Sequence, residues 1–184
     1  MIPSRRLPFT ADPDAQALLG ANHTALLIGV VLYQQIPVEK AFAGPALLAA
    51  RLGTELDASH IAAMDPAALE AAFRERPALH RFPASMAKRT QAVCAHLVTA
   101  HGGDPEGLWR NVASADEVMS RLKDMPGFGD YKARIYFGLL CKWFDIRPTG
   151  WEKVMPDWPT ITDVDAFEDL AELKARKKAW KEAG

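Results

Sequence analysis

The chain has 184 residues, a length that supports one substantial hydrophobic core or two small helical lobes. Its 22 basic and 23 acidic side chains give a net charge of −1 at pH 7, so any nucleic-acid contact would need a local basic face. The longest apolar run, residues 25–33, is too short to cross a bilayer, and residues 1–6 lack the apolar stretch of a signal peptide. We therefore expect a soluble, cytoplasmic protein that has no membrane partner.

Residues that start and end helices separate the segments of the chain, and no stretch alternates apolar and polar residues as a strand does. Together these features predict an all-α fold. The segment 25–32 is apolar on every side, which is typical of a buried central helix. Ser114 and Glu117 form the pattern of a capping box at the start of another helix. Beyond Pro148 the chain is expected to be irregular until the last helix. The expected helices, in chain order, are 12–19, 25–32, 38–51, 57–64, 66–74, 86–100, 115–125, 130–143 and 165–181.

The two cysteines, Cys94 and Cys141, lie in apolar runs and show no metal-ligand spacing. We expect both to be reduced residues of the core. The sequence gives no indication of a protein-bound metal.

The most informative stretch is MPGFGDYKA, residues 125–133, which joins two expected helices. Gly127 and Gly129 tolerate backbone angles closed to other residues, so a very tight turn can form. Without side chains there, a phosphate can approach the N–H groups of the turn, and the start of the next helix attracts the same anion. Phe128 is expected to point inward and pin the two helices together. The alternative is an ordinary glycine-containing turn between packed helices.

This turn resembles the helix-hairpin-helix of base-excision DNA glycosylases (the HhH-GPD superfamily). Nearly the whole chain is similar to a compact bacterial branch of that superfamily, through residues 32–45, 76–83, 125–133 and 147–151. The resemblance implies a single two-lobed unit with a DNA cleft between the lobes. We expect one lobe at about 24–132 and the other from 1–23 together with 133–184. It also implies a monomer that flips a damaged or mismatched base out of duplex DNA.

The resemblance further implies which residues contact DNA. Gln35, with its neighbour Gln34, stands where the family places a residue that fills the gap left by a flipped base. Residues 79–83 match a loop that often carries a wedge side chain. The alternatives are that both glutamines are solvated and that Leu79 and Phe82 are core contacts. Besides the two hairpin glycines, the expected phosphate contacts are His80, Arg81, Lys88 and Lys132.

The catalytic lysine position of the family is Tyr131 in this chain, so the resemblance implies a monofunctional enzyme that uses water and does not cut the strand. Lys132 is one residue further, about 100° around a helix, and is expected to contact phosphate instead. Tyr131 would face the base. Tyr33 and Trp151 are the other expected residues of the base pocket.

The family's catalytic aspartate falls on Thr149, which cannot hold a negative charge beside a developing cation. Glu39 is the first expected substitute, and Asp145 and Glu152 are the others. Alternatively, base release depends on binding and on a good leaving base, or the protein is a catalytically silent DNA binder or lesion sensor. A purely structural helical protein is a third reading.

The family's four-cysteine iron–sulfur loop is missing, so no cofactor is expected beyond a K⁺ or Na⁺ ion held by the hairpin. The chain instead ends in a basic helix with Lys174, Arg176, Lys177, Lys178 and Lys181. This helix either follows the DNA backbone or is simply solvated.

Overall fold

The computed structural model describes residues 5–184, so the expectation about the first six residues lies mostly outside the described part. Within that part the protein has nine α-helices, three short 3₁₀-helices and no strand, which confirms the all-α prediction. The α-helices are α1 Pro13–Ala21, α2 His23–Leu32, α3 Val38–Leu52, α4 Ala58–Ala63, α5 Pro66–Arg74, α6 Pro83–His101, α7 Ala115–Asp124, α8 Asp130–Phe144 and α9 Asp169–Ala183. The 3₁₀-helices are η1 Pro105–Leu108, η2 Trp151–Val154 and η3 Ile161–Asp163.

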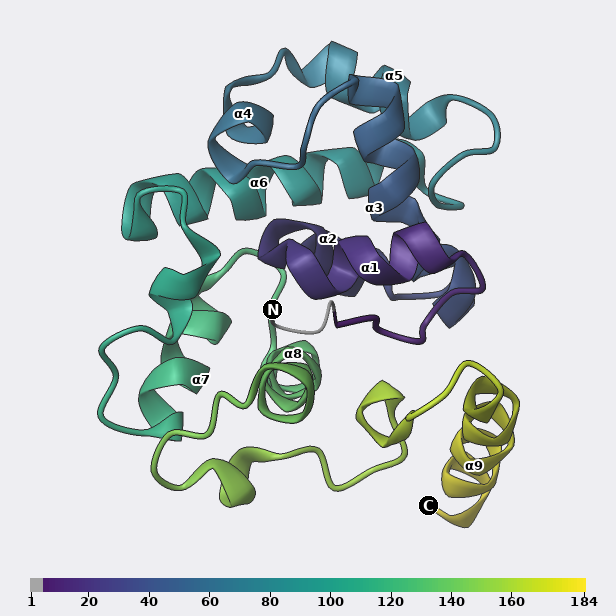
Figure 1. Cartoon of the computed structure of the whole chain (residues 1–184), viewed down its shortest axis with the longest axis vertical. Helices are drawn as coiled ribbons and strands as arrows, with labels where there is room; N and C mark the ends of the chain where they lie inside the picture. The colour runs from purple at the N-terminus through teal and green to yellow at the C-terminus, as the bar shows by residue number, and fades with distance from the viewer. Residues whose placement is uncertain (1–4) are drawn as a thin grey trace.

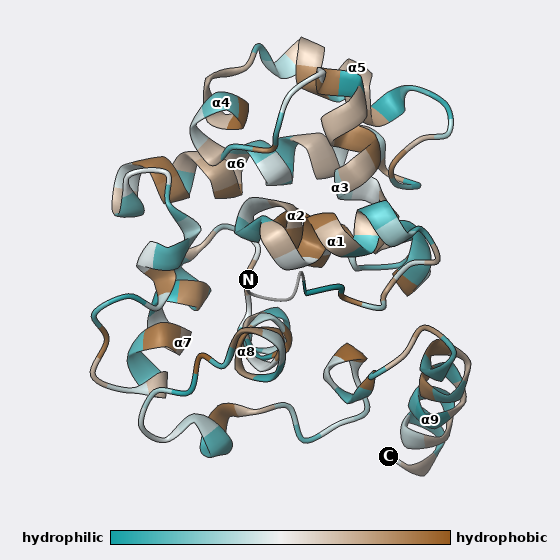
Figure 2. Ribbon diagram, in the orientation of Figure 1, coloured by the Kyte–Doolittle hydropathy of each residue, from teal (hydrophilic) through white to brown (hydrophobic). Residues whose placement is uncertain are grey.

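The central helix is α2, as its sequence predicts: every residue from Thr24 to Leu32 is buried. Around it, α3 packs along one side, α1 packs on both α2 and α3, and α6 carries α4 and α5 on its outer face (Figure 1). Figure 2 shows the contrast between this hydrophobic centre, brown on much of α2, and the mostly teal, hydrophilic α9. The fold is therefore built around one buried helix, α2.

The helices from α7 onward form a second group that shares a continuous hydrophobic core with the first. There α7 packs on α8 and η2, while η3 packs on α8 and α9. In the first group α1 packs with α2 and α3, and in the second the glycine turn joins α7 to α8. Phe9 links the groups, since its ring lies 5.0 Å from Phe42 and 6.4 Å from Trp143.

One helix starts earlier than expected, and another starts where the sequence predicts. The sixth helix begins at Pro83 and not at 86, because proline is favoured in the first helical turn, where its missing N–H costs nothing. At α7, Ser114 Oγ accepts from the Glu117 N–H at 3.3 Å, but the Glu117 carboxylate accepts from the N–H of Ala113. The expected cap therefore forms, with its return bond one residue earlier than in a standard capping box.

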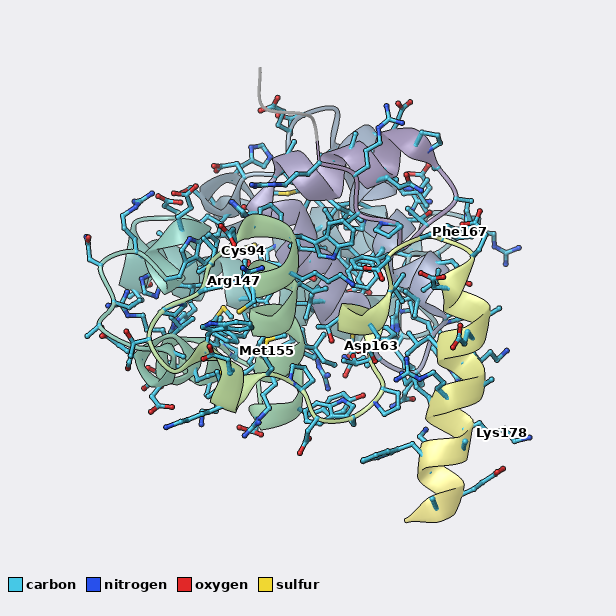
Figure 3. The ribbon with its side chains drawn as sticks, turned by 60° about the horizontal axis from the view of Figure 1, so that its bottom comes forward. Cys94, Arg147, Met155, Asp163, Phe167 and Lys178 are labelled. Carbon is cyan, nitrogen blue, oxygen red and sulfur yellow. The ribbon has the colours of Figure 1, made fainter. Side chains whose placement is uncertain are left out.

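The last helix extends from the body of the protein. Only Leu170 and Leu173 of α9 are buried, and its C-terminal half projects beyond the other helices (Figure 3). In the described chain no single helix is both long and apolar enough to span a membrane; α1 and α2 together would pass that test but bend by 113° between them.

Candidate functional site

The glycine turn between α7 and α8 is tight and open to solvent. Gly127 has a φ of +78°, in the left-handed region that favours glycine. The N–H of Phe128 donates to the carbonyl of Met125 at 3.1 Å, and the Phe128 ring is buried, as predicted. A Cβ atom built on Gly127 or Gly129 would meet no atom within 4 Å. The backbone of the turn is therefore accessible to a large ligand.

The turn leads directly into the first turn of α8. Gly129 is the N-cap and supplies no side-chain hydrogen bond, so the first N–H groups of α8 keep their capacity to bind an anion. Asp130 stands beside them, but its carboxylate is paired with Arg134 at 2.8 Å and lies 3.9 Å from Lys123. These two cations offset the charge of Asp130 at the helix end.

Three adjoining hollows share Lys177 in their lining, and two of them lie beside the start of α8; we refer to the three together as the lysine cleft. The first hollow, of about 930 Å³, separates α9 from the α2–α3 loop and the start of α3. The second, of about 300 Å³, lies between that loop and α8, and the third, of about 290 Å³, lies between α8, Trp158 and α9. Lys177 lines all three, Gln35 the first two and Tyr131 the last two.

Six lysines and one acid line the lysine cleft. The acid is Glu39; the lysines are Lys40, Lys132, Lys174, Lys177, Lys178 and Lys181. Within residues 5–184, Lys178 is the only one of these six lysines with a carboxylate within 4 Å, that of Glu182 at 3.9 Å. A protein of net charge −1 thus concentrates uncompensated positive charge along one cleft, which attracts anions.

A contact between Lys177 and Tyr33 ties α9 to the α2–α3 loop. The Lys177 Nζ donates to the Tyr33 hydroxyl at 2.7 Å and lies 5.1 Å from the centre of its ring. Burial, with a smaller contribution from the nearby Glu39 charge, raises the pKa of Tyr33 to about 12. The phenol therefore keeps its proton at neutral pH.

Lys132 points into the second hollow with Gln35 and Tyr131. Burial lowers the pKa of Lys132 to about 8, and the positive charge of Arg89 adds to this effect. Its ammonium also lies 5.5 Å from the centre of the Phe128 ring. Such a partly desolvated ammonium gains more than an exposed one from a phosphate partner.

The two glutamines of the α2–α3 loop have different surroundings. The Gln34 side chain is held by the protein, with its Nε2 3.2 Å from Met86 Sδ and its Oε1 3.2 Å from an Arg89 nitrogen. Gln35 is exposed, lines the cleft and adopts a φ of +58°, which costs energy for a residue other than glycine. Both glutamines line the second hollow, but Gln35 also lines the first, and its side chain is the more exposed of the two.

His80 has a different position from the one that the sequence suggested. Its side chain is buried and hydrogen-bonded to the backbone of Gln34 and Phe82, so it is not exposed to a DNA phosphate. Leu79 belongs to the core, whereas Phe82 is 46% exposed and carries Arg81 5.1 Å from its ring centre. Phe82 is thus the apolar side chain that this loop presents to solvent. Lys88 is exposed on α6, beside Arg89.

Tyr131 stacks on Trp158, with ring centroids 5.1 Å apart and an interplanar angle of 15°. Trp180 of α9 joins them around the third hollow. Trp158 and Trp180 were not among the residues expected from the sequence, because no local pattern marks them. Lys40 was not expected either, and the role of the α9 lysines stayed open, although positions 174, 177, 178 and 181 share one helix face.

The remaining expected residues lie elsewhere. Asp145 caps the C-terminal end of α8, about 20 Å along the helix from Tyr131, and pairs with Arg147 at 3.1 Å. Trp151 lies against the same Arg147, 5.3 Å from ring centre to guanidinium, and lines none of the three hollows. The carbonyl of Thr149 accepts from Ala115 at the start of α7. The structure thus brings Glu39 to the cleft and leaves Asp145 and Trp151 outside it.

Both cysteines are buried and free, as expected. Within residues 5–184 no group of three or more His, Cys, Asp or Glu side chains is placed to hold a metal ion. No protein-family model, curated protein or solved structure gives a significant match to the chain.

Proposed function

We propose that this protein is a DNA-binding repair protein of the helix-hairpin-helix glycosylase type, which flips a damaged or mismatched base and hydrolyses its N-glycosidic bond. One observation carries the proposal: an exposed glycine turn leads directly into a helix whose first turn places Tyr131 and Lys132 in a lysine-lined cleft opposite Gln35. A turn that only connects two helices does not require an aromatic ring, lysines and a glutamine beside it.

Binding uses the sugar-phosphate backbone of one strand. The bare backbone at 127–129 and the uncapped start of α8 receive a phosphate, and the cleft lysines of α9 follow the same strand. Gln35 enters the duplex, and Phe82 is the wedge on the neighbouring loop. The strained backbone at Gln35 fits a residue that is held ready for such insertion.

Glu39 is the proposed catalytic carboxylate of the site. Within the described part of the chain it is the one carboxylate that lines the lysine cleft, in the first turn of α3 and near Tyr33. An ionised carboxylate there stabilises the positive charge that develops on the sugar and orients the attacking water. The protonated Tyr33 hydroxyl can donate to an acceptor on the departing base, and Tyr131 offers its ring for stacking.

A catalytically silent DNA binder or lesion sensor is the second candidate, and Thr149 favours it. Thr149 stands where the resemblance expects a catalytic aspartate, and Glu39 shares its hollow with five lysines that oppose a cationic transition state. In this case the protein binds DNA through the same cleft as the proposed glycosylase but does not cleave the N-glycosidic bond.

The test uses end-labelled duplexes that contain uracil, an alkylated adenine, an oxidised guanine or a mismatch. Strand breaks that appear only after alkali treatment establish a monofunctional glycosylase. Binding that weakens steeply with salt, without breaks on any substrate, establishes the silent binder. A protein that binds no duplex at low salt refutes both candidates.

A further inference from the structure

The third hollow of the lysine cleft has the composition of a stacking site for a nucleobase. It is lined by Tyr131, Trp158, Pro159, Lys177, Trp180 and Lys181. Flat aromatic side chains alternate there with ammonium groups, and its volume of about 290 Å³ suits a small, flat ligand. Aromatic faces beside positive charge are the means by which proteins hold unpaired bases without reading their sequence.

The exposure of these aromatic rings needs an explanation. Tyr131 is 55% exposed and Trp180 is 56% exposed, although large aromatic side chains usually stabilise a fold by being buried. Both belong to the same small hollow, one from the first turn of α8 and the other from the projecting end of α9. Two exposed rings from distant parts of the chain therefore converge on one place.

The stacking geometry is already present in the protein. Tyr131 and Trp158 lie nearly parallel, at an interplanar angle of 15° and a centroid distance of 5.1 Å. A base that enters the hollow can extend this stack, and Trp180 can cover it from α9. Lys177 and Lys181 stand at the same hollow, where they can neutralise the phosphate of the nucleotide.

We infer that the hollow between Tyr131, Trp158 and Trp180 binds one unpaired nucleobase adjacent to the strand held by the glycine turn. This inference rests on the proposed DNA binding and narrows its substrate. The preferred DNA carries an unpaired nucleotide, such as a one-nucleotide bulge, and a fully paired duplex binds less tightly. The site is distinct from the second hollow, which Tyr131 lines together with Gln35 and Lys132.

The experiment compares three labelled DNAs by fluorescence anisotropy: a paired duplex, the same duplex with a one-nucleotide bulge, and that bulge with an abasic residue. We expect the bulge to bind roughly tenfold more tightly than the other two, because base–aromatic stacking contributes on that order. Trp180→Ala should abolish the preference and leave affinity for the paired duplex unchanged. Trp180→Phe should retain most of it. Val98→Ala removes an exposed apolar side chain on α6, away from the hollow, and serves as the control that should keep the preference for the bulge.

A second readout reports the stacking itself. A 2-aminopurine at the bulge should lose fluorescence when wild-type protein binds and keep it with Trp180→Ala. A bulge preference that is equal for the abasic residue, or that survives Trp180→Ala, overturns the stacking site while DNA binding stands. If the protein binds the paired duplex and the bulge equally well, the stacking site is likewise overturned and DNA binding stands. Loss of binding to all three DNAs instead overturns the proposed function, and the inference with it.

Discussion

The imidazole Nε2 of His80 lies 2.8 Å from the backbone carbonyl oxygen of Gln34 and donates a hydrogen bond to it. The donor is Nε2 because the other ring nitrogen, Nδ1, accepts from the N–H of Phe82 at 3.0 Å. One neutral imidazole thus joins the loop that carries Gln35 to the loop that carries Phe82. In the proposed complex these two loops supply the residue that fills the gap and the residue that wedges the stack.

The first prediction concerns His80 and pH. Burial lowers the pKa of His80 from its usual 6.5, although the hydrogen bond to Gln34 opposes this. Because the unfolded chain then binds the proton more tightly, the contribution of His80 to stability is complete above about pH 6.5 and declines as the pH falls below it. His80→Gln should lower the free energy of unfolding at pH 7.5 by about 1–3 kcal/mol, through unpaired buried groups.

Urea unfolding at pH 7.5 and 5.5 measures this effect. The wild type should lose more stability between the two values than His80→Gln does. His60→Gln, at an exposed position on α4, should behave like the wild type at both. Equal losses in the wild type and His80→Gln would show that the buried imidazole does not titrate in this range.

The second prediction separates binding from folding at the glycine turn. Gly129 has a φ of −80° and open space around it, so alanine fits its backbone without strain. The weaker capping by alanine and its smaller loss of chain entropy offset each other, and stability should change by less than about 1 kcal/mol. A methyl group there keeps a phosphate away from the backbone, so DNA affinity should fall on the order of tenfold.

Gly53→Ala is the matched control for that substitution. Gly53 ends α3 at a φ of +66°, so alanine should cost about 1 kcal/mol of stability. It lines no part of the lysine cleft, and DNA affinity should not change. Thermal melting compares the stability of the two variants, and duplex titration compares their affinity for DNA. Normal binding by Gly129→Ala would remove the turn from the interface.

The third prediction compares two carboxylates. Glu39→Gln keeps the shape of the side chain but removes the negative charge from the cleft, and single-turnover base release should fall at least about 100-fold. Asp145→Asn should leave the rate unchanged, because Asp145 lies at the far end of α8 and asparagine tolerates its left-handed backbone. Rates are measured with enzyme in excess over labelled duplex. An unaltered rate in Glu39→Gln would exclude it as the catalytic group.

Local patterns were enough to predict the helices and the glycine turn. The all-apolar face of α2 and the inward Phe128 each depend on residues close together in the chain. The cleft could not be predicted in the same way, because Trp158, Trp180 and Lys177 meet α8 and Tyr33 through tertiary packing alone. His80 shows the reverse error: its sequence neighbour Arg81 suggested a basic surface, but two backbone hydrogen bonds hold the imidazole inside.

The last prediction uses the lowered pKa of Lys132. A phosphate beside its ammonium would raise that pKa above the value of about 8 in the free protein, so binding takes up a proton at alkaline pH. Affinity for duplex DNA should therefore fall about tenfold from pH 7 to pH 9. Lys132→Arg, which stays charged throughout, should bind with little pH dependence, and Lys88→Arg should behave like the wild type.

Borohydride trapping distinguishes this role of Lys132 from amine chemistry. A neutral lysine amine can condense with the aldehyde of an abasic site, releasing water and leaving an imine that borohydride reduces to a stable amine. We expect no such adduct, because the proposed attacking group is water. An adduct that forms with the wild type and disappears in Lys132→Arg would show that this amine, partly deprotonated near neutral pH, is a nucleophile and not a phosphate contact.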